Sequence, residues 1–276
     1  MPIQSTPELI VIDGAAPVRA QVFQGAVARP APLVLHLPGG SFLHAPECRG
    51  PVPRLLAEAG AVVVSAAYPV GTAHPFPGAL EVLYALLTAL QERRTHWASR
   101  ASRLFVAGEE AGGNLATALA MMARDRLGPK LAGQILLSPM LDAGMATCSF
   151  RDAEAGPVGC KWADGWQAYL GTPGKASHPY AVPARGTRLH GLPPALVITT
   201  TDDPMRDESL DYARRLREAG VLLHVRALKA DDWPDALAVE AGQCRGDWEE
   251  PVRVAFAEFI AAVTPGLSPA PLKTRS

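Results

Sequence analysis

The stretch of residues 103–122 constrains the fold more than any other part of the chain. Its first five residues form a short, apolar, β-prone run, and apolar residues recur at helical spacing from residue 116 onward. Between these two parts, Gly108 and Gly112 stand two residues to either side of Glu110. Small residues in such places let a chain reverse sharply. The sequence therefore predicts a buried strand, a tight turn with Glu110 at its apex, and a helix.

The same glycine spacing occurs in G-x-S-x-G turns, in which the central serine is lifted above a sheet to act as a nucleophile. In this chain the central residue is Glu110. An ordinary strand–helix junction with close packing produces the same spacing, so the interpretation depends on the rest of the chain.

Short apolar runs alternate with amphipathic stretches over most of the sequence. Two antiparallel edge strands, joined near Asp13–Gly14, are predicted within residues 8–24. Further strands are predicted at 33–37, 61–65, 103–107, 134–139, 196–200 and 221–227. Helices are predicted at 54–59, 83–90, 116–122, 209–219 and 248–263. This alternation predicts a single α/β domain over residues 1–276 with a mostly parallel sheet. The tail, residues 264–276, is rich in Pro and Ser and is predicted to be disordered.

Four motifs occur in a fixed order, at residues 38–42, 68–80, 108–113 and 203–208. Together they resemble the motifs of the hormone-sensitive-lipase-like carboxylesterase branch of the α/β-hydrolases. The resemblance covers about residues 33–263 and implies an α/β-hydrolase fold, with helices on both faces of a mostly parallel central sheet.

The resemblance implies an oxyanion cradle after the strand at 33–37. In the family, backbone N–H groups at this point stabilise the negative oxygen formed during acyl transfer. Gly39 and Gly40 keep the family's glycines, Ser41 replaces the third glycine, and Ala111 supplies the N–H that follows the turn.

The resemblance also assigns the three positions of the catalytic triad. Asp203 holds the position of the acid, and Glu110 replaces the nucleophilic serine. The histidine position falls on Asp232 or Trp233, in a loop (228–235) that contains no histidine. Loss of the serine or the histidine costs a triad several orders of magnitude in rate. We therefore do not expect ordinary serine-esterase turnover.

Three functions remain open. In the first, Glu110 acts as a nucleophile or general base in non-esterase chemistry, such as a lyase or isomerase reaction, or in carboxylate-assisted hydrolysis. In the second, a catalytically inactive pseudo-hydrolase binds a small molecule with a carbonyl or carboxyl group. In the third, the chain is a structural or partner protein. We expect a repurposed small-molecule-pocket enzyme, with the binding protein as its close alternative.

No cofactor or metal is expected, although an acidic group offers oxygen ligands to a hard cation as a minor alternative. The residues of this group are Glu109, Glu110, Asp203, Asp231 and Asp232. Among the histidines, His44 follows the cradle and could reach the mouth of a pocket. The others do not replace the triad histidine easily, since His36 and His224 fall in predicted strands and His178 and His190 in loops.

Residues 143–190 differ in character from the rest, because glycine and proline recur there. Three aromatic residues, Trp162, Trp166 and Tyr169, stand at near-helical spacing. In the family this excursion covers the pocket, and we expect at least two of the three aromatics to pack its helix onto the body. The family's helical N-terminal segment has no counterpart here, so we expect a reduced N-terminal cap and a more open site.

The composition gives no reason to expect a nucleic-acid or membrane partner. The net charge is −1 and the pI is about 6.7, and no apolar run approaches the ~20 residues that span a bilayer. The N-terminus lacks the pattern of a secretory signal. Four scattered cysteines, Cys48, Cys148, Cys160 and Cys244, predict free thiols in the cytoplasm. A homodimer is left open.

Overall fold

The computed structural model describes residues 2–25, 30–44, 47–152, 156–229 and 248–264. The described strands form one sheet in the order β1-β2-β4-β3-β5-β6-β7-β8. They are β1 (Gln4–Ile12), β2 (Ala15–Gln24), β3 (Leu33–Leu37), β4 (Val62–Ala66), β5 (Leu104–Glu109), β6 (Leu131–Leu137), β7 (Ala195–Thr200) and β8 (Leu223–Leu228). The β1–β2 and β2–β4 pairs are antiparallel, and the other neighbouring pairs are parallel.

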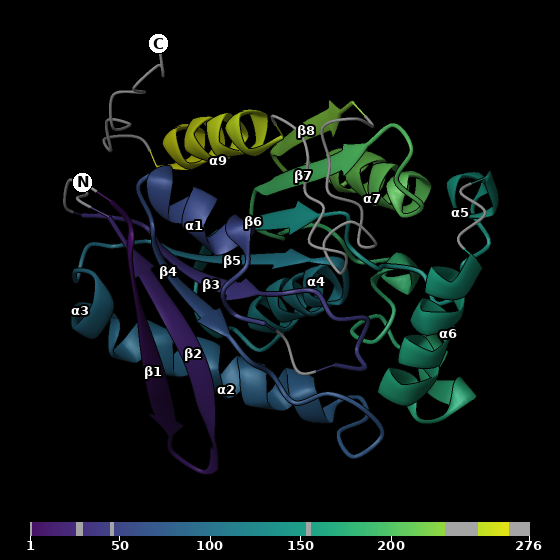
Figure 1. Cartoon of the computed structure of the whole chain (residues 1–276), viewed down its shortest axis with the longest axis horizontal. Helices are drawn as coiled ribbons and strands as arrows, with labels where there is room; N and C mark the ends of the chain where they lie inside the picture. Colours follow the sequence, from purple (N-terminus) through teal and green to yellow (C-terminus); the bar gives the residue numbers. More distant parts are fainter. Residues whose placement is uncertain (1, 26–29, 45–46, 153–155, 230–247, 265–276) are drawn as a thin grey trace.

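Helices cover both faces of this sheet (Figure 1). The helices are α1 (Pro51–Glu58), α2 (Gly78–Glu92), α3 (Arg94–Trp97), α4 (Glu110–Asp125), α5 (Cys148–Asp152), α6 (Gly156–Leu170), α7 (Arg206–Glu218) and α9 (Glu249–Val263), with 3-10 turns η1 (Pro173–Ser177) and η2 (Pro183–Arg185). One apolar cluster joins α1 and α9 to the sheet, and a second joins α2, α4 and α7 to its other face. The α/β-hydrolase fold predicted from the sequence is therefore confirmed.

The two N-terminal strands form the predicted antiparallel hairpin, with a turn at Asp13–Gly14. The prediction that both are edge strands is wrong for β2. This strand pairs with β1 on one side and with β4 on the other, and so it lies inside the sheet.

The central strands are buried on both faces, as helices on both sides of a parallel sheet require. All five residues of β3 are buried, and so are all five of β4. Successive side chains alternate between the two apolar clusters. Val34 packs toward α1 and α9, whereas Leu35 packs toward α2 and α4.

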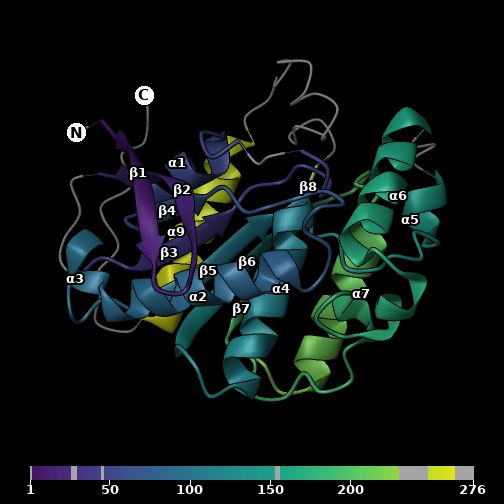
Figure 2. The ribbon, with the colours of Figure 1, turned by 90° about the horizontal axis from the view of Figure 1, so that it is seen from below.

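The excursion at residues 143–190 carries α5 and α6. Both views of the ribbon place α6 beyond one end of the sheet (Figures 1 and 2). Trp162, Trp166 and Tyr169 are all buried, and the rings of Tyr169 and Phe42 stack with centroids 4.2 Å apart. The expectation that at least two of these aromatics pack α6 onto the body is confirmed.

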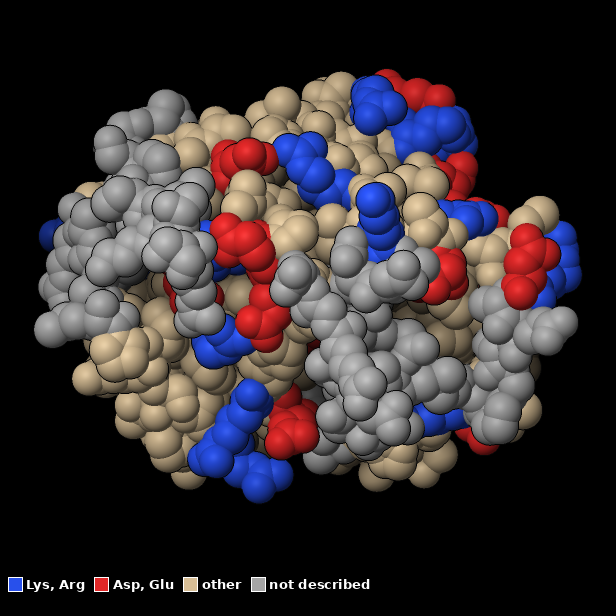
Figure 3. All heavy atoms as spheres, turned by 45° about the horizontal axis from the view of Figure 1, so that its top comes forward, with Lys and Arg blue, Asp and Glu red and all other residues tan. Residues whose placement is uncertain are grey.

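The surface and helices show two further features that bear on function. No helix in the described part of the chain has the length and apolarity needed to cross a membrane. On the face drawn in Figure 3, basic and acidic side chains are interspersed.

Candidate active site

The site is organised by the junction of β5 and α4. Glu110 is the first residue of α4 and has a φ of 53°, in the left-handed region. A Cβ on Gly108 would lie 2.2 Å from the carbonyl oxygen of Gly112, and one on Gly112 would lie 2.0 Å from that of Leu37. Only glycines fit at these two places, so the strand can turn at once into the helix.

The predicted cradle loop follows β3 and faces this junction. Gly40 has a φ of 140° and Ser41 a φ of 53°, so both amides are turned out of the strand direction. The hydroxyl of Tyr68 donates to the carbonyl oxygen of Pro38 at 2.6 Å and fixes the start of the loop. The loop is thus held with its N–H groups directed at the first turn of α4.

The carboxylate of Glu110 occupies this cradle. Its Oε2 accepts hydrogen bonds from the backbone N–H of Gly40 at 2.6 Å and of Ser41 at 3.1 Å. Its Oε1 accepts from the Ser41 hydroxyl at 2.9 Å and from the Trp162 indole N–H at 2.5 Å. A carboxylate has about four acceptor positions. The four donors therefore fill the acceptor positions of the Glu110 carboxylate, and no position is left for a further hydrogen bond.

The other predicted cradle residues also border the glutamate. Gly39 packs so closely that a Cβ there would lie 2.6 Å from Glu110 Oε2. Ala111 follows Glu110 in α4 and is fully buried. The amides that contact the carboxylate are those of Gly40 and Ser41.

Trp162 brings α6 into the site, as the resemblance implied for this excursion, and its contact with Glu110 is the part that the sequence did not suggest. Gly165, nearly one turn further along α6, packs against the cradle, and a Cβ there would lie 1.8 Å from the carbonyl oxygen of Ser41. Spacing in the sequence showed that Trp162 lies on a helix but not that its N–H meets Glu110.

Asp203 lies just after β7 and is 8 % exposed. Its carboxylate accepts hydrogen bonds from the hydroxyls of Ser138 (2.5 Å) and Thr199 (2.7 Å) and from the backbone N–H of Met205 (2.8 Å). Burial raises the pKa of Asp203, and these three hydrogen bonds act in the opposite direction. The contact with Ser138, which has a φ of 41°, was also not predicted.

Some of the remaining predicted residues lie outside the described part of the chain, and the others lie away from the cradle. Asp231, Asp232 and Trp233 lie outside the described residues. Glu109 does not join Glu110 in the cradle but places its Oε1 3.2 Å from His36 Nε2. His44 is exposed. Among the described residues, no group of three or more histidine, cysteine or acidic side chains is placed to hold a metal ion.

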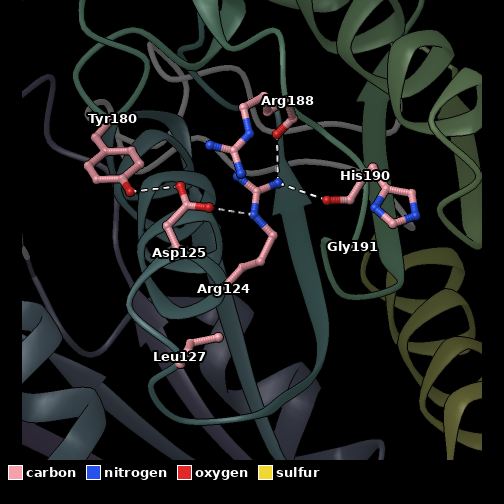
Figure 4. A pocket seen from close by; sticks show the side chains of 7 residues that line it. All are labelled: Arg124, Asp125, Leu127, Tyr180, Arg188, His190 and Gly191. Atoms are coloured by element: carbon pink, nitrogen blue, oxygen red, sulfur yellow. Dashed lines mark hydrogen bonds and ion pairs between the residues drawn. The ribbon is translucent and has the colours of Figure 1, made fainter.

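A cavity of about 630 Å³ opens at the far end of α4 (Figure 4). It is lined by Arg124, Asp125, Leu127, Tyr180, Arg188, His190 and Gly191. Because α4 rises about 1.5 Å per residue and Glu110 is at its opposite end, this cavity is separate from the cradle. Arg124 there donates to Asp125 and to the carbonyl oxygens of Arg188 and His190. These bonds tie the 188–191 loop to the helix.

The fold and this junction define an α/β-hydrolase. A family described as having the alpha/beta hydrolase fold matches residues 34–231, and the chain belongs to this family, in its hormone-sensitive-lipase-like carboxylesterase branch.

Relatives of the chain include both enzymes and receptors. It is 33 % identical to carboxylesterase NlhH of Mycobacterium tuberculosis, over 76 % of this chain and 68 % of that protein. It is 30 % identical to the gibberellin receptor GID1 of Oryza sativa, over 80 % of this chain and 66 % of the receptor. Among solved structures, a hyperthermophilic esterase from Pyrobaculum calidifontis is 32 % identical, with a TM-score of 0.79, over 94 % of this chain and 85 % of that chain.

Proposed function

We propose that the chain is a hydrolase-fold protein that binds a small molecule bearing a carbonyl or carboxyl group and does not cleave esters. The observation that supports this proposal is the carboxylate of Glu110 in the cradle. The donors that an esterase directs at the oxyanion of its substrate are already hydrogen-bonded to the protein's own side chain.

The residue types support the same conclusion. The apex of the β5–α4 turn is Glu110, where the resembling enzymes carry a serine hydroxyl, and the 228–235 loop contains no imidazole. Acyl transfer by a triad needs both the hydroxyl and the base that takes its proton. The acid position, Asp203, has no imidazole to orient among its described partners, which are Ser138, Thr199 and Met205.

The cradle also indicates the chemistry of the ligand. Two backbone N–H groups, one hydroxyl and one indole N–H already bind a carboxylate here. A ligand carboxylate or carbonyl that displaces Glu110 would meet the same donors. The similarity to a protein named as a gibberellin receptor supports a binding role for this scaffold.

A carboxylate-dependent lyase or isomerase is the second candidate. The observation in its favour is the burial of Asp203, which raises the pKa of this carboxyl group, the direction that suits a general acid. Against it, Glu110 would have to leave four donors before it could act as a base or a nucleophile. We therefore place binding first.

An ester-hydrolysis assay tests the proposal. p-Nitrophenyl acetate is given to the wild type, to Glu110→Ser and to Glu110→Ser combined with Trp233→His. We expect no turnover from the first two and measurable turnover from the double variant, which regains a hydroxyl and an imidazole. Wild-type turnover that a serine-directed phosphonate abolishes would refute the proposal.

A second assay separates binding from other chemistry. Small carboxylates, such as benzoate, and ketones are incubated with the wild type, and binding is followed through tryptophan fluorescence. The recovered molecules are then analysed by mass spectrometry. Saturable binding with unchanged ligand supports the binding role, whereas a chemically altered ligand supports the lyase or isomerase.

A further inference from the structure

The cavity at the end of α4 lies away from the cradle, and the binding role proposed for the cradle does not use it (Figure 4). Its walls come from the last turn of α4, from Tyr180 and from the loop at residues 188–191. Its volume is about 630 Å³. Pockets that hold small molecules have volumes of about 300–1,000 Å³. The cavity is therefore large enough for an organic ligand.

The loop that forms one wall is fixed by arginines from two different helices. Arg124 of α4 donates to the carbonyl oxygens of Arg188 at 2.6 Å and His190 at 3.0 Å. Arg215 of α7 donates to the carbonyl oxygen of Gly186, earlier in the same segment. Because these bonds hold the backbone in place, a ligand does not have to order the loop when it binds.

The lining of the cavity carries one positive charge in excess. Arg124 and Arg188 are its two cations and Asp125 is its acidic residue, with His190 counted as neutral. The Arg124 guanidinium, with Nε 2.8 Å from Asp125 Oδ1, lowers the pKa of this carboxyl group and keeps it ionised. Arg124 also stands in the last turn of α4, where its charge counters the negative end of the helix dipole. The charge that is left over belongs to Arg188.

The Arg188 guanidinium has no hydrogen-bond or ion-pair partner within the described part of the chain. In Figure 4 a dashed line reaches the carbonyl oxygen of Arg188 but none reaches its side chain. Its charge also lowers the pKa of Asp125, so the guanidinium lies near this carboxylate, on the cavity. A guanidinium is a planar fork of N–H donors that matches the two oxygens of a carboxylate.

Leu127 supplies an apolar rim to the cavity at a cost in stability. It is 94 % exposed and has a φ of 51°, in the left-handed region. The Gly128 N–H donates to the Ala123 carbonyl oxygen at 2.9 Å and closes the helix around Leu127, at a position where glycine is usual. A glycine there would avoid the strain. A leucine that is both strained and exposed beside a cavity indicates a contact with the apolar part of a ligand.

We propose that this cavity binds a small organic carboxylate with an apolar body. The carboxylate pairs with the Arg188 guanidinium through two parallel N–H···O bonds. The apolar body lies against Leu127 and the ring of Tyr180. One negative charge matches the one excess positive charge of the lining, and a body of several carbon atoms is needed to fill the volume.

Equilibrium dialysis of 4-phenylbutanoate against the wild type, Arg188→Gln and Arg100→Gln tests the proposal. Arg100 is the matched control, because it is an exposed arginine outside the lining and its replacement changes the net charge equally. We expect saturable binding to the wild type, about tenfold weaker binding to Arg188→Gln, and no change in Arg100→Gln, since hydrogen bonds to a charged group are lost in the first variant alone. The uncharged 4-phenylbutanamide should bind the wild type about tenfold more weakly than the carboxylate.

Leu127→Gly gives two results of opposite sign. The glycine relieves the left-handed strain, so the variant should unfold at a higher urea concentration than the wild type. It also removes the apolar contact, so 4-phenylbutanoate should bind about threefold more weakly. Loss of affinity in a more stable protein cannot be attributed to misfolding.

Tryptophan fluorescence separates this cavity from the cradle, which also accepts carboxylates under the function proposed above. Trp162 contacts Glu110 in the cradle, whereas no tryptophan is among the residues that line the cavity. Binding that changes the fluorescence and is equal in Arg188→Gln and the wild type would place the ligand in the cradle and overturn the proposal. Absence of saturable binding, equal affinity for the amide, or unchanged affinity in Leu127→Gly would also overturn it.

Discussion

Replacing Glu110 by glutamine tests whether the cradle is held by its internal anion. The amide keeps one acceptor oxygen, but its NH2 group must face one of the two donor pairs, either the Gly40 and Ser41 amides or the Ser41 hydroxyl and the Trp162 indole. Two hydrogen bonds to a charged acceptor are lost. At about 1.5–3 kcal/mol for each such bond, and with a reduction because Glu110 is only partly buried, we expect a loss of about 3 kcal/mol.

The assay is urea unfolding followed by circular dichroism, with tryptophan fluorescence as a second probe. Glu92→Gln is the matched control, since Glu92 is exposed at the end of α2, and surface substitutions change stability by about 0.5 kcal/mol or less. If Glu110→Gln unfolds at the same urea concentration as the wild type, the four contacts do not stabilise the fold and the reasoning is refuted.

Two further predictions concern the helix α6 and the buried acid Glu208. Gly165→Ala places a Cβ 1.8 Å from the Ser41 carbonyl oxygen. We expect this clash to destabilise the fold by about 2 kcal/mol and to shift the tryptophan fluorescence. Gly174→Ala is the control, because nothing lies within 4 Å of the added atom, and it should show neither effect. Burial raises the pKa of Glu208 well above its usual 4.5, so the folded state keeps the proton to higher pH than the unfolded state. The unfolding free energy of the wild type should therefore fall as pH rises from about 4.5 through the raised pKa of Glu208. Glu208→Gln should lack this fall. If urea unfolding at several pH values gives the same dependence on pH for both proteins, Glu208 is not the cause.

Local sequence features predicted the β5–α4 turn and the position of the cradle. The spacing of Gly108 and Gly112 around Glu110 reflects contacts within a few residues, which a sequence displays directly. The order of Gly39 and Gly40 after a buried run likewise identified the loop that the structure brings to the turn.

Contacts between distant segments could not be predicted in the same way. Trp162 is 52 positions from Glu110, and its helical spacing shows only which side of α6 is apolar. The orientation of the Glu110 carboxylate into the cradle depends on that indole and on the Ser41 hydroxyl. The contacts of His36 with Ser65 and Glu109 depend on the strand order β4-β3-β5, which alternation of apolar residues does not reveal.

The absence of a side chain at position 39 has a consequence for how this family can vary. The Glu110 carboxylate reaches the Gly40 amide across the space that a Cβ on Gly39 would fill. Any larger residue at 39 would therefore collide with the Glu110 carboxylate, 2.6 Å from the added Cβ, and would also crowd the Glu110 Cβ at 3.3 Å. The residue at position 39 and the side chain at position 110 therefore limit each other's size. The space that Gly39 leaves beside the cradle is filled here by the Glu110 carboxylate.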